Sequence, residues 1–353
     1  MIYDKSGRPG RDALLIGSIP LADAATVFRT TGEILGSYLR QVPDGETGPR
    51  SNWIGWQLEV MRAATFLTQR RSTTGYGAVM VDLFSPRDPT SDPSSWEFGS
   101  LGYASSAISS YSEFRRLKVG GVLPPDIKFQ VSLPTPLAPV TSFIEPDFYV
   151  AVEQAYERRM RSEIDAILRT VPAEELAIQW DTAVEFALLE GVFPGALMNR
   201  RDLIVERLVK LTTWMPQSVD LGFHLCYGDA GHKHFIEPKS CALLVDVANA
   251  VLEGSRRRID WLHLPVPKSR DDLDYFEPLS ALRRPKDMRV YLGLLHLGDG
   301  LEGARSRVRA ANNFIADFGI ATECGFGRRP VDHVVPLLQL HASILRELNN
   351  TIC

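Results

Sequence analysis

The strongest constraint on the fold of this chain is a regular alternation of short apolar runs with longer amphipathic runs. The apolar runs have the length of strands, and the segments between them carry apolar residues at a spacing near 3.6, which is typical of helices. We assign eight runs as strands: Asp12–Ile19, Tyr38–Val42, Ile127–Leu133, Leu176–Asp181, Val219–Cys226, Ile259–Leu264, Met288–His296 and Gly319–Cys324.

Strands that alternate with helices at this spacing predict βαβ units and a parallel sheet, hence an α/β fold. Eight such units that close on themselves form a (β/α)8 TIM barrel, and residues 1–353 are expected to be a single barrel domain. The doubly wound alternative usually has a glycine-rich first turn, which the sequence LLIGSIPLAD at 14–23 lacks. An inserted β-hairpin is expected around 76–103, from the strand-like runs Tyr76–Phe84 and Trp96–Tyr103, after a helix over Ser51–Thr68.

Composition limits the classes of function. The net charge of −4, without a long basic run, gives no reason to expect a nucleic-acid partner. No apolar stretch approaches the roughly 18 residues of a membrane span, and the N-terminus lacks a signal peptide's apolar region, so we expect a cytoplasmic protein. The cysteines are too few for a disulfide framework and are expected to be free thiols or metal ligands: Cys226, Cys241, Cys324 and Cys353.

Polar side chains gather at the expected strand ends, where the chemistry of a TIM barrel lies. His224 and Cys226 are two residues apart and therefore share one face of their strand. Cys324, at the end of the last strand, adds a second sulfur. One imidazole and two thiolates suit tetrahedral zinc with an open fourth position, and such a zinc can hold a substrate thiol as a thiolate. The alternative is that all three are ordinary buried residues of the barrel.

Other strand ends supply further candidates. Glu46 and Asp181 fit three roles: general base, carboxylate that binds an ammonium group, or surface charge. His296 or Asp299 is expected, from position alone, to donate a proton to a leaving group. His232 and His234 are expected to contact substrate or lie in a loop.

Six sequence pieces resemble, in order, the catalytic C-terminal barrel of the cobalamin-independent methionine synthase family. They are IGSIP (16–20), DGE (44–46), FQVSLPTPLAPV (129–140), IQWD (178–181), HLCYG (224–228) and ECGFGRR (323–329). The resemblance implies a zinc barrel that transfers a methyl group to a thiol. It implies His224, Cys226 and Cys324 as zinc ligands. It also implies that Ser18, Glu46 and Asp181 bind the amino-acid part of homocysteine.

The chain departs from the family pattern at several points. Pro267 stands where the family has a glutamate as its fourth zinc ligand, so His263, water or the substrate thiolate would fill that position. The IQWD piece continues with Thr182, Ala183 and Val184 in place of Glu-Pro-Ala. The family's aromatic contact to folate and its N-terminal barrel have no equivalent.

These observations predict a zinc-dependent methyl- or alkyltransferase that activates a thiol as a zinc thiolate. Its partners would be a small-molecule thiol and a methyl or alkyl donor, with a folate among the candidate donors. Assembly into a homo-oligomer is left as an open alternative. One alternative is a decarboxylase or lyase of the uroporphyrinogen decarboxylase-like barrel type, which would need cationic residues at the mouth. The other is a zinc-binding protein without transfer activity.

Overall fold

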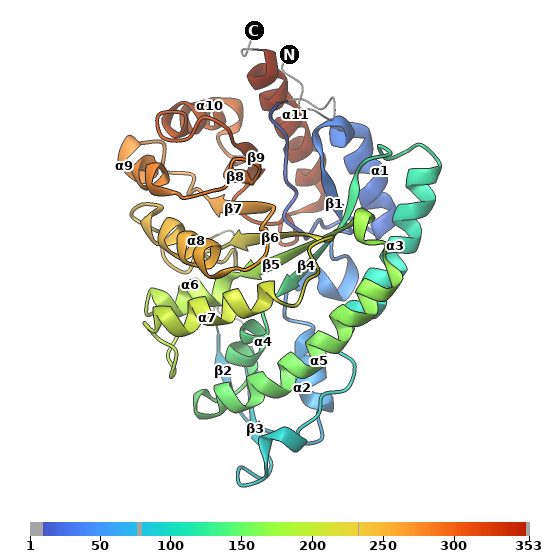
Figure 1. Cartoon of the computed structure of the whole chain (residues 1–353), viewed down its shortest axis with the longest axis vertical. Coiled ribbons are helices and arrows are strands. Elements are labelled where there is room, and N and C mark those ends of the chain that lie inside the picture. The colour runs from blue at the N-terminus through green and yellow to red at the C-terminus, as the bar shows by residue number, and fades with distance from the viewer. Residues whose placement is uncertain (1–9, 76–79, 232, 351–353) are drawn as a thin grey trace.

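A curled sheet of parallel strands forms the centre of the molecule (Figure 1). The computed structural model describes residues 10–75, 80–231 and 233–350. The sheet has the strand order β1-β4-β5-β6-β7-β8-β9, which confirms the α/β class and seven of the eight expected strands. Their bounds are β1 (Gln41–Pro43), β4 (Lys128–Pro134), β5 (Leu176–Thr182), β6 (Asp220–Leu225), β7 (Trp261–Pro265), β8 (Arg289–Leu295) and β9 (Gly319–Thr322).

Helices surround the sheet and follow its strands along the chain (Figure 1). The longest, α5 (Tyr149–Thr170), buries Val152, Tyr156, Met160 and Ile164, whose spacing of four places them on one face. The others are α1 (Ala24–Leu35), α2 (Gln57–Ala63), α3 (Tyr103–Val119), α4 (Leu137–Phe143), α6 (Ala183–Leu189), α7 (Arg201–Thr212), α8 (Ala242–Gly254), α9 (Leu273–Phe276), α10 (Gly300–Ala311) and α11 (Val334–Asn350). Within the described ranges, no helix is both long and apolar enough to cross a membrane.

The segment 12–19 is not the regular strand that the sequence predicts. Isolated parallel bridges join Ala13 to Leu39 and to Ile320, so the segment touches both edges of the seven-stranded sheet. The carbonyls of Leu15 and Ile16 accept hydrogen bonds from side chains, among them the Gln130 amide at 3.0 and 2.8 Å. Side chains therefore take the place of a continuous ladder here, and the expected closed eight-stranded barrel is replaced by a curled sheet of seven strands.

The inserted hairpin exists, but it lies earlier in the chain than expected. It pairs β2 (Leu67–Thr74) with β3 (Met80–Pro86) in antiparallel fashion. The expected helix over Ser51–Thr68 shrinks to α2, and the run from Trp96 to Tyr103 is not a strand. Trp96 is buried because its ring stacks on Phe66 with centroids 5.3 Å apart, so an aromatic cluster explains the apolar run there. The start of the expected strand at Tyr76 lies outside the described residues.

Candidate metal centre and its cavity

His224, Cys226 and Cys324 converge at the carboxyl end of the sheet. His224 lies on β6, Cys226 follows that strand directly, and Cys324 follows β9 by two residues. One ligand atom from each of the three lies within 4.8 Å of the others, and the two sulfurs are 3.8 Å apart. The structure thus brings together the three residues that the sequence proposed as metal ligands.

An independent observation supports zinc as the ion that these three side chains would bind. Nε2 of His224 is buried and has no hydrogen-bond partner, although a buried ring nitrogen normally has one. Two sulfurs and an unpartnered imidazole nitrogen are the ligand types of catalytic zinc sites with three protein ligands. The cost of leaving this nitrogen unpaired disappears if it binds a metal.

His263 supports His224 from the neighbouring strand, β7. The Nδ1 atoms of the two rings are 2.7 Å apart, and Nε2 of His263 lies 3.0 Å from the carbonyl oxygen of Thr322. Burial lowers the pKa of His263 to about 3, and burial followed by the neighbouring ring lowers the pKa of His224 well below its usual value, so both rings are neutral.

The hydrogen bonds then fix the tautomers of both rings. A carbonyl only accepts, so Nε2 of His263 carries the proton and its Nδ1 accepts from Nδ1 of His224. Nε2 of His224 is left with a free lone pair. Both nitrogens of His263 are occupied, so the ring orients the candidate ligand His224 and is not free to fill the fourth position suggested for it.

A cationic side chain, which the sequence argument did not single out, lies against the sulfurs. Nη2 of Arg328 is 3.6 Å from the Cys324 sulfur and 3.0 Å from a carboxylate oxygen of Asp229. The pKa of Cys324 is lowered, first by the thiol of Cys226 and also by this guanidinium, while that same hydrogen bond and burial raise the pKa of Cys226 well above its usual value. The four-residue spacing of Cys324 and Arg328 was the one signal in the sequence.

Two carboxyl groups, those of Glu46 and Asp181, also line this cavity. Burial, followed by the charge of Asp181, raises the pKa of Glu46 well above its usual value, and burial raises that of Asp181. Only Asp181 has a described side-chain partner, the Gln179 amide at 2.9 Å. A positive charge bound beside these groups would offset the cost of ionising them, so they favour a cationic ligand.

Ser18 lines the same cavity and also supports the loop that carries Cys324. Its hydroxyl oxygen accepts a hydrogen bond from the backbone N–H of Gly327 at 3.2 Å. A Cβ at Gly325 would lie 2.4 Å from that oxygen, so only glycine fits there. Ser18 therefore positions the loop in addition to the binding role predicted for it.

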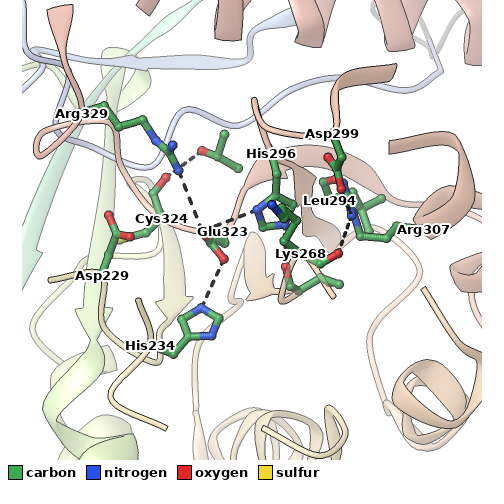
Figure 2. A network of polar contacts seen from close by, with 12 residues as sticks. Asp229, His234, Lys268, Leu294, His296, Asp299, Arg307, Glu323, Cys324 and Arg329 are labelled. Carbon is green, nitrogen blue, oxygen red and sulfur yellow. Dashed lines mark hydrogen bonds and ion pairs between the residues drawn. The ribbon is translucent and has the colours of Figure 1, made fainter. Parts of the chain in front are cut away.

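His296 and Asp299 are not among the described residues that line the cavity. Figure 2 shows His296 beside Glu323 and Asp299 beside Arg307. His296 makes a 2.9 Å contact from Nε2 to the Val266 carbonyl oxygen and a 3.6 Å contact from Nδ1 to Glu323. Asp299 accepts two hydrogen bonds from Arg307, at 2.8 and 3.0 Å. Their assignment as proton donors stays a prediction.

Glu323 organises a polar network beside Cys324 (Figure 2). One carboxylate oxygen is 3.4 Å from His234, and the other is near His296 and, at 3.8 Å, Arg329. Although burial alone would raise it, the pKa of Glu323 is lowered by His234 and His296, and Glu323 in turn raises the pKa of His234. His234 is thus a supporting residue of this loop, and His232 and Cys353 lie outside the described residues.

The candidate metal centre opens into a cavity of about 700 Å³. Its base contains the three candidate ligands together with Ser18, Glu46, Asp181, Asp229 and Arg328. Its outer walls come from the β2/β3 hairpin, the α4–α5 region and the α6 helix with the loop that follows it. The volume is that of a typical small-molecule site.

Fold and site together define a class: parallel α/β proteins with a His/Cys/Cys group at the carboxyl ends of the strands.

No family model and no curated protein matches the sequence. Solved structures do match. A B12-independent methionine synthase from Shewanella sp. W3-18-1 in complex with selenomethionine aligns with a TM-score of 0.61 and 14% identity over 96% of this chain and 98% of that one. A proposed vitamin-B12-independent methionine synthase from Listeria monocytogenes aligns with a TM-score of 0.59 and 12% identity over 95% and 96%. The chain therefore has the fold of these methionine-synthase-like proteins.

Proposed function

We propose that this protein is a zinc-dependent transferase that moves a methyl or alkyl group to a small-molecule thiol. The observation that carries the proposal is the unpartnered, buried Nε2 of His224 beside two sulfurs at the base of a cavity. The fold shared with the methionine-synthase-like structures agrees with it. A zinc ion held by these three residues would lower the pKa of a substrate thiol and make it a thiolate at neutral pH.

The side chains around the centre have separate tasks in this proposal. His263 holds the His224 ring so that its Nε2 would be free to bind zinc, and Arg328 offsets negative charge on the Cys324 sulfur. Glu46 and Asp181 bind the ammonium group of an amino-acid thiol, whose positive charge would favour ionisation of both carboxyls. Homocysteine is the thiol that this arrangement suits, and selenomethionine in the Shewanella complex is an amino acid of the same kind.

The transfer balances as a simple displacement. The sulfur lone pair forms the new sulfur–carbon bond while the bond between that carbon and the donor's leaving group breaks. The bonding electrons depart with the leaving group, which takes up the proton that the thiol lost. The products are a thioether and the protonated leaving group, so no oxidant or reductant is required.

The test measures metal content and transfer on matched cysteine variants. We expect about one zinc per chain in the wild type, little in Cys226→Ser and Cys324→Ser, and loss of transfer to homocysteine in both. Cys241→Ser is the matched control, because Cys241 is also a buried free thiol but lies outside the metal group. Full zinc and activity in Cys226→Ser would overturn the proposal.

The same experiment separates the other two interpretations. Wild-type protein without zinc would favour a decarboxylase or lyase. Against that class, the arginines that line the described cavity already pair with acidic residues, Arg71 with Glu145 and Arg328 with Asp229. Stoichiometric zinc whose X-ray absorption gains no sulfur when homocysteine is added would favour a zinc-binding protein without transfer activity.

A further inference from the structure

The base and the outer part of the cavity differ in chemistry. The base gathers the ionisable groups described above, whereas the outer part is mostly hydrocarbon and aromatic. Apolar side chains of the outer part come from five segments, represented by Trp53, Met80, Phe143, Val192, Phe193 and Phe235.

The hairpin supplies one of these walls through strand register. Thr73 pairs with Val81, and Arg71 pairs with Leu83, across β2 and β3. Residues paired directly across two strands point to the same face. All four of these side chains line the cavity, so one face of the hairpin is directed into it, next to the α4 and α5 helices (Figure 1).

The rim of the cavity exposes hydrophobic side chains to solvent. Met80 is 63% exposed and Val192 is 38% exposed, and both line the opening. Exposed apolar residues that border a cavity are typical of a binding site for an apolar ligand.

The outer part contains no uncompensated positive charge among its described residues. Its one arginine, Arg71, donates two hydrogen bonds to Glu145, from Nε at 2.8 Å and from Nη2 at 3.1 Å. A donor with several carboxylates or phosphates would need free cations here, because burying an unpaired charge is costly.

From these features we infer that the outer part binds an uncharged, largely apolar alkyl donor. The inference rests on the proposed function, since the thiol occupies the polar base and leaves the apolar part for the second substrate. A polyglutamyl folate, whose tail carries one carboxylate per residue, does not match the lining that the described residues give this part of the cavity.

Two fluorescent probes with nearly the same apolar body test the inference. N-phenyl-1-naphthylamine is uncharged, and 8-anilino-1-naphthalenesulfonate adds a sulfonate. We expect the uncharged probe to bind one site per chain at least about tenfold more tightly than the anionic probe. A methyltetrahydropteroyl triglutamate competitor is expected not to displace it. Tighter binding of the anionic probe, or displacement by the triglutamate, overturns the inference.

A matched pair of valine variants locates the probe. Val192→Asp places a carboxylate at the rim and is expected to lower the affinity for the uncharged probe about tenfold. Val335→Asp is the control, because Val335 is 41% exposed, close to the 38% of Val192, but lies on α11 outside the cavity lining. Equal weakening by both variants, or a halved molecular mass of Val192→Asp in light scattering, overturns the inference in favour of a general or an intermolecular apolar surface.

Zinc content measured on the same samples separates this inference from the proposed function. A protein that prefers the uncharged probe but holds no zinc supports the apolar ligand class and overturns the transferase proposal. A protein that holds one zinc per chain but prefers the anionic probe supports the transferase proposal and overturns this inference.

Discussion

His263 and His224 face each other through their Nδ1 atoms at 2.7 Å, and the carbonyl of Thr322 holds the far side of the His263 ring. This relationship leaves Nε2 of His224 as the free ligand atom. We expect His263→Leu to weaken zinc binding about 10- to 100-fold, because the His224 ring loses the partner that fixes its tautomer and orientation. Competition with a chelator of known affinity measures the change.

His263→Asn is the matched variant for this prediction. Its side-chain oxygen can accept the proton of His224 Nδ1 from nearly the same position, so most of the zinc affinity should return. Equal losses in the leucine and asparagine variants would mean that His263 matters only for packing.

Asp299→Asn distinguishes a proton donor from a structural ion pair. The change removes the charged partner of Arg307, a buried side chain that also donates to the carbonyls of Leu294 and Lys268. We expect unfolding free energy to fall by about 2 kcal/mol, since Arg307 keeps those two partners. Urea denaturation measures this loss. Transfer activity at a temperature where the variant is folded should stay within about threefold of wild type, and a drop of about a hundredfold or more would restore Asp299 as a catalytic acid.

Much of the metal centre could be predicted from the sequence because parallel strands deliver their carboxyl ends to one edge. Alternation along β6 placed His224 and Cys226 together, and the last strand added Cys324. The role of His263 could not be predicted, because it depends on which way two rings on adjacent strands turn.

The differences between the predicted and the observed fold have a similar origin. The irregular segment at 12–19 results from side-chain hydrogen bonds by Gln130, Ser132 and Gln179, which lie more than a hundred residues away in the chain. The hairpin lies earlier than expected because LTQRRSTT at 67–74 is polar and overlaps the end of the helix expected over Ser51–Thr68, whereas Trp96 packs in an aromatic cluster. Local pattern does not reveal partners at such separations.

Glu46→Gln tests the amino-acid subsite. The variant removes one of the two carboxyl groups proposed to bind the ammonium group, so we expect KM for homocysteine to rise about tenfold while zinc content and stability at neutral pH are retained. Steady-state kinetics and elemental analysis measure these quantities. An unchanged KM would show that the ammonium group binds elsewhere.

Glu185→Gln is the control for Glu46→Gln, since Glu185 is a buried carboxyl outside the cavity lining. Burial raises the pKa of Glu185 from 4.5 to about 7. The folded state therefore holds a proton that the unfolded state loses between those values, and stability falls as pH rises through that range. Glu185→Gln should flatten this decline and leave KM unchanged.

His341 should make the fold sensitive to acid independently of the metal. Burial lowers its pKa from 6.5 to about 4, and Nε2 has no hydrogen-bond partner. Between these values the unfolded state binds a proton that the folded state excludes, so stability is lost as pH falls from 6.5 toward 4, by up to about 3 kcal/mol from this residue.

His341→Leu cannot take up that proton, and its ring-free side chain suits the buried face of α11. Urea denaturation at several pH values should therefore give the leucine variant a shallower fall in stability than the wild type, with similar stability at neutral pH. Parallel curves for the two proteins would assign the acid sensitivity to other groups.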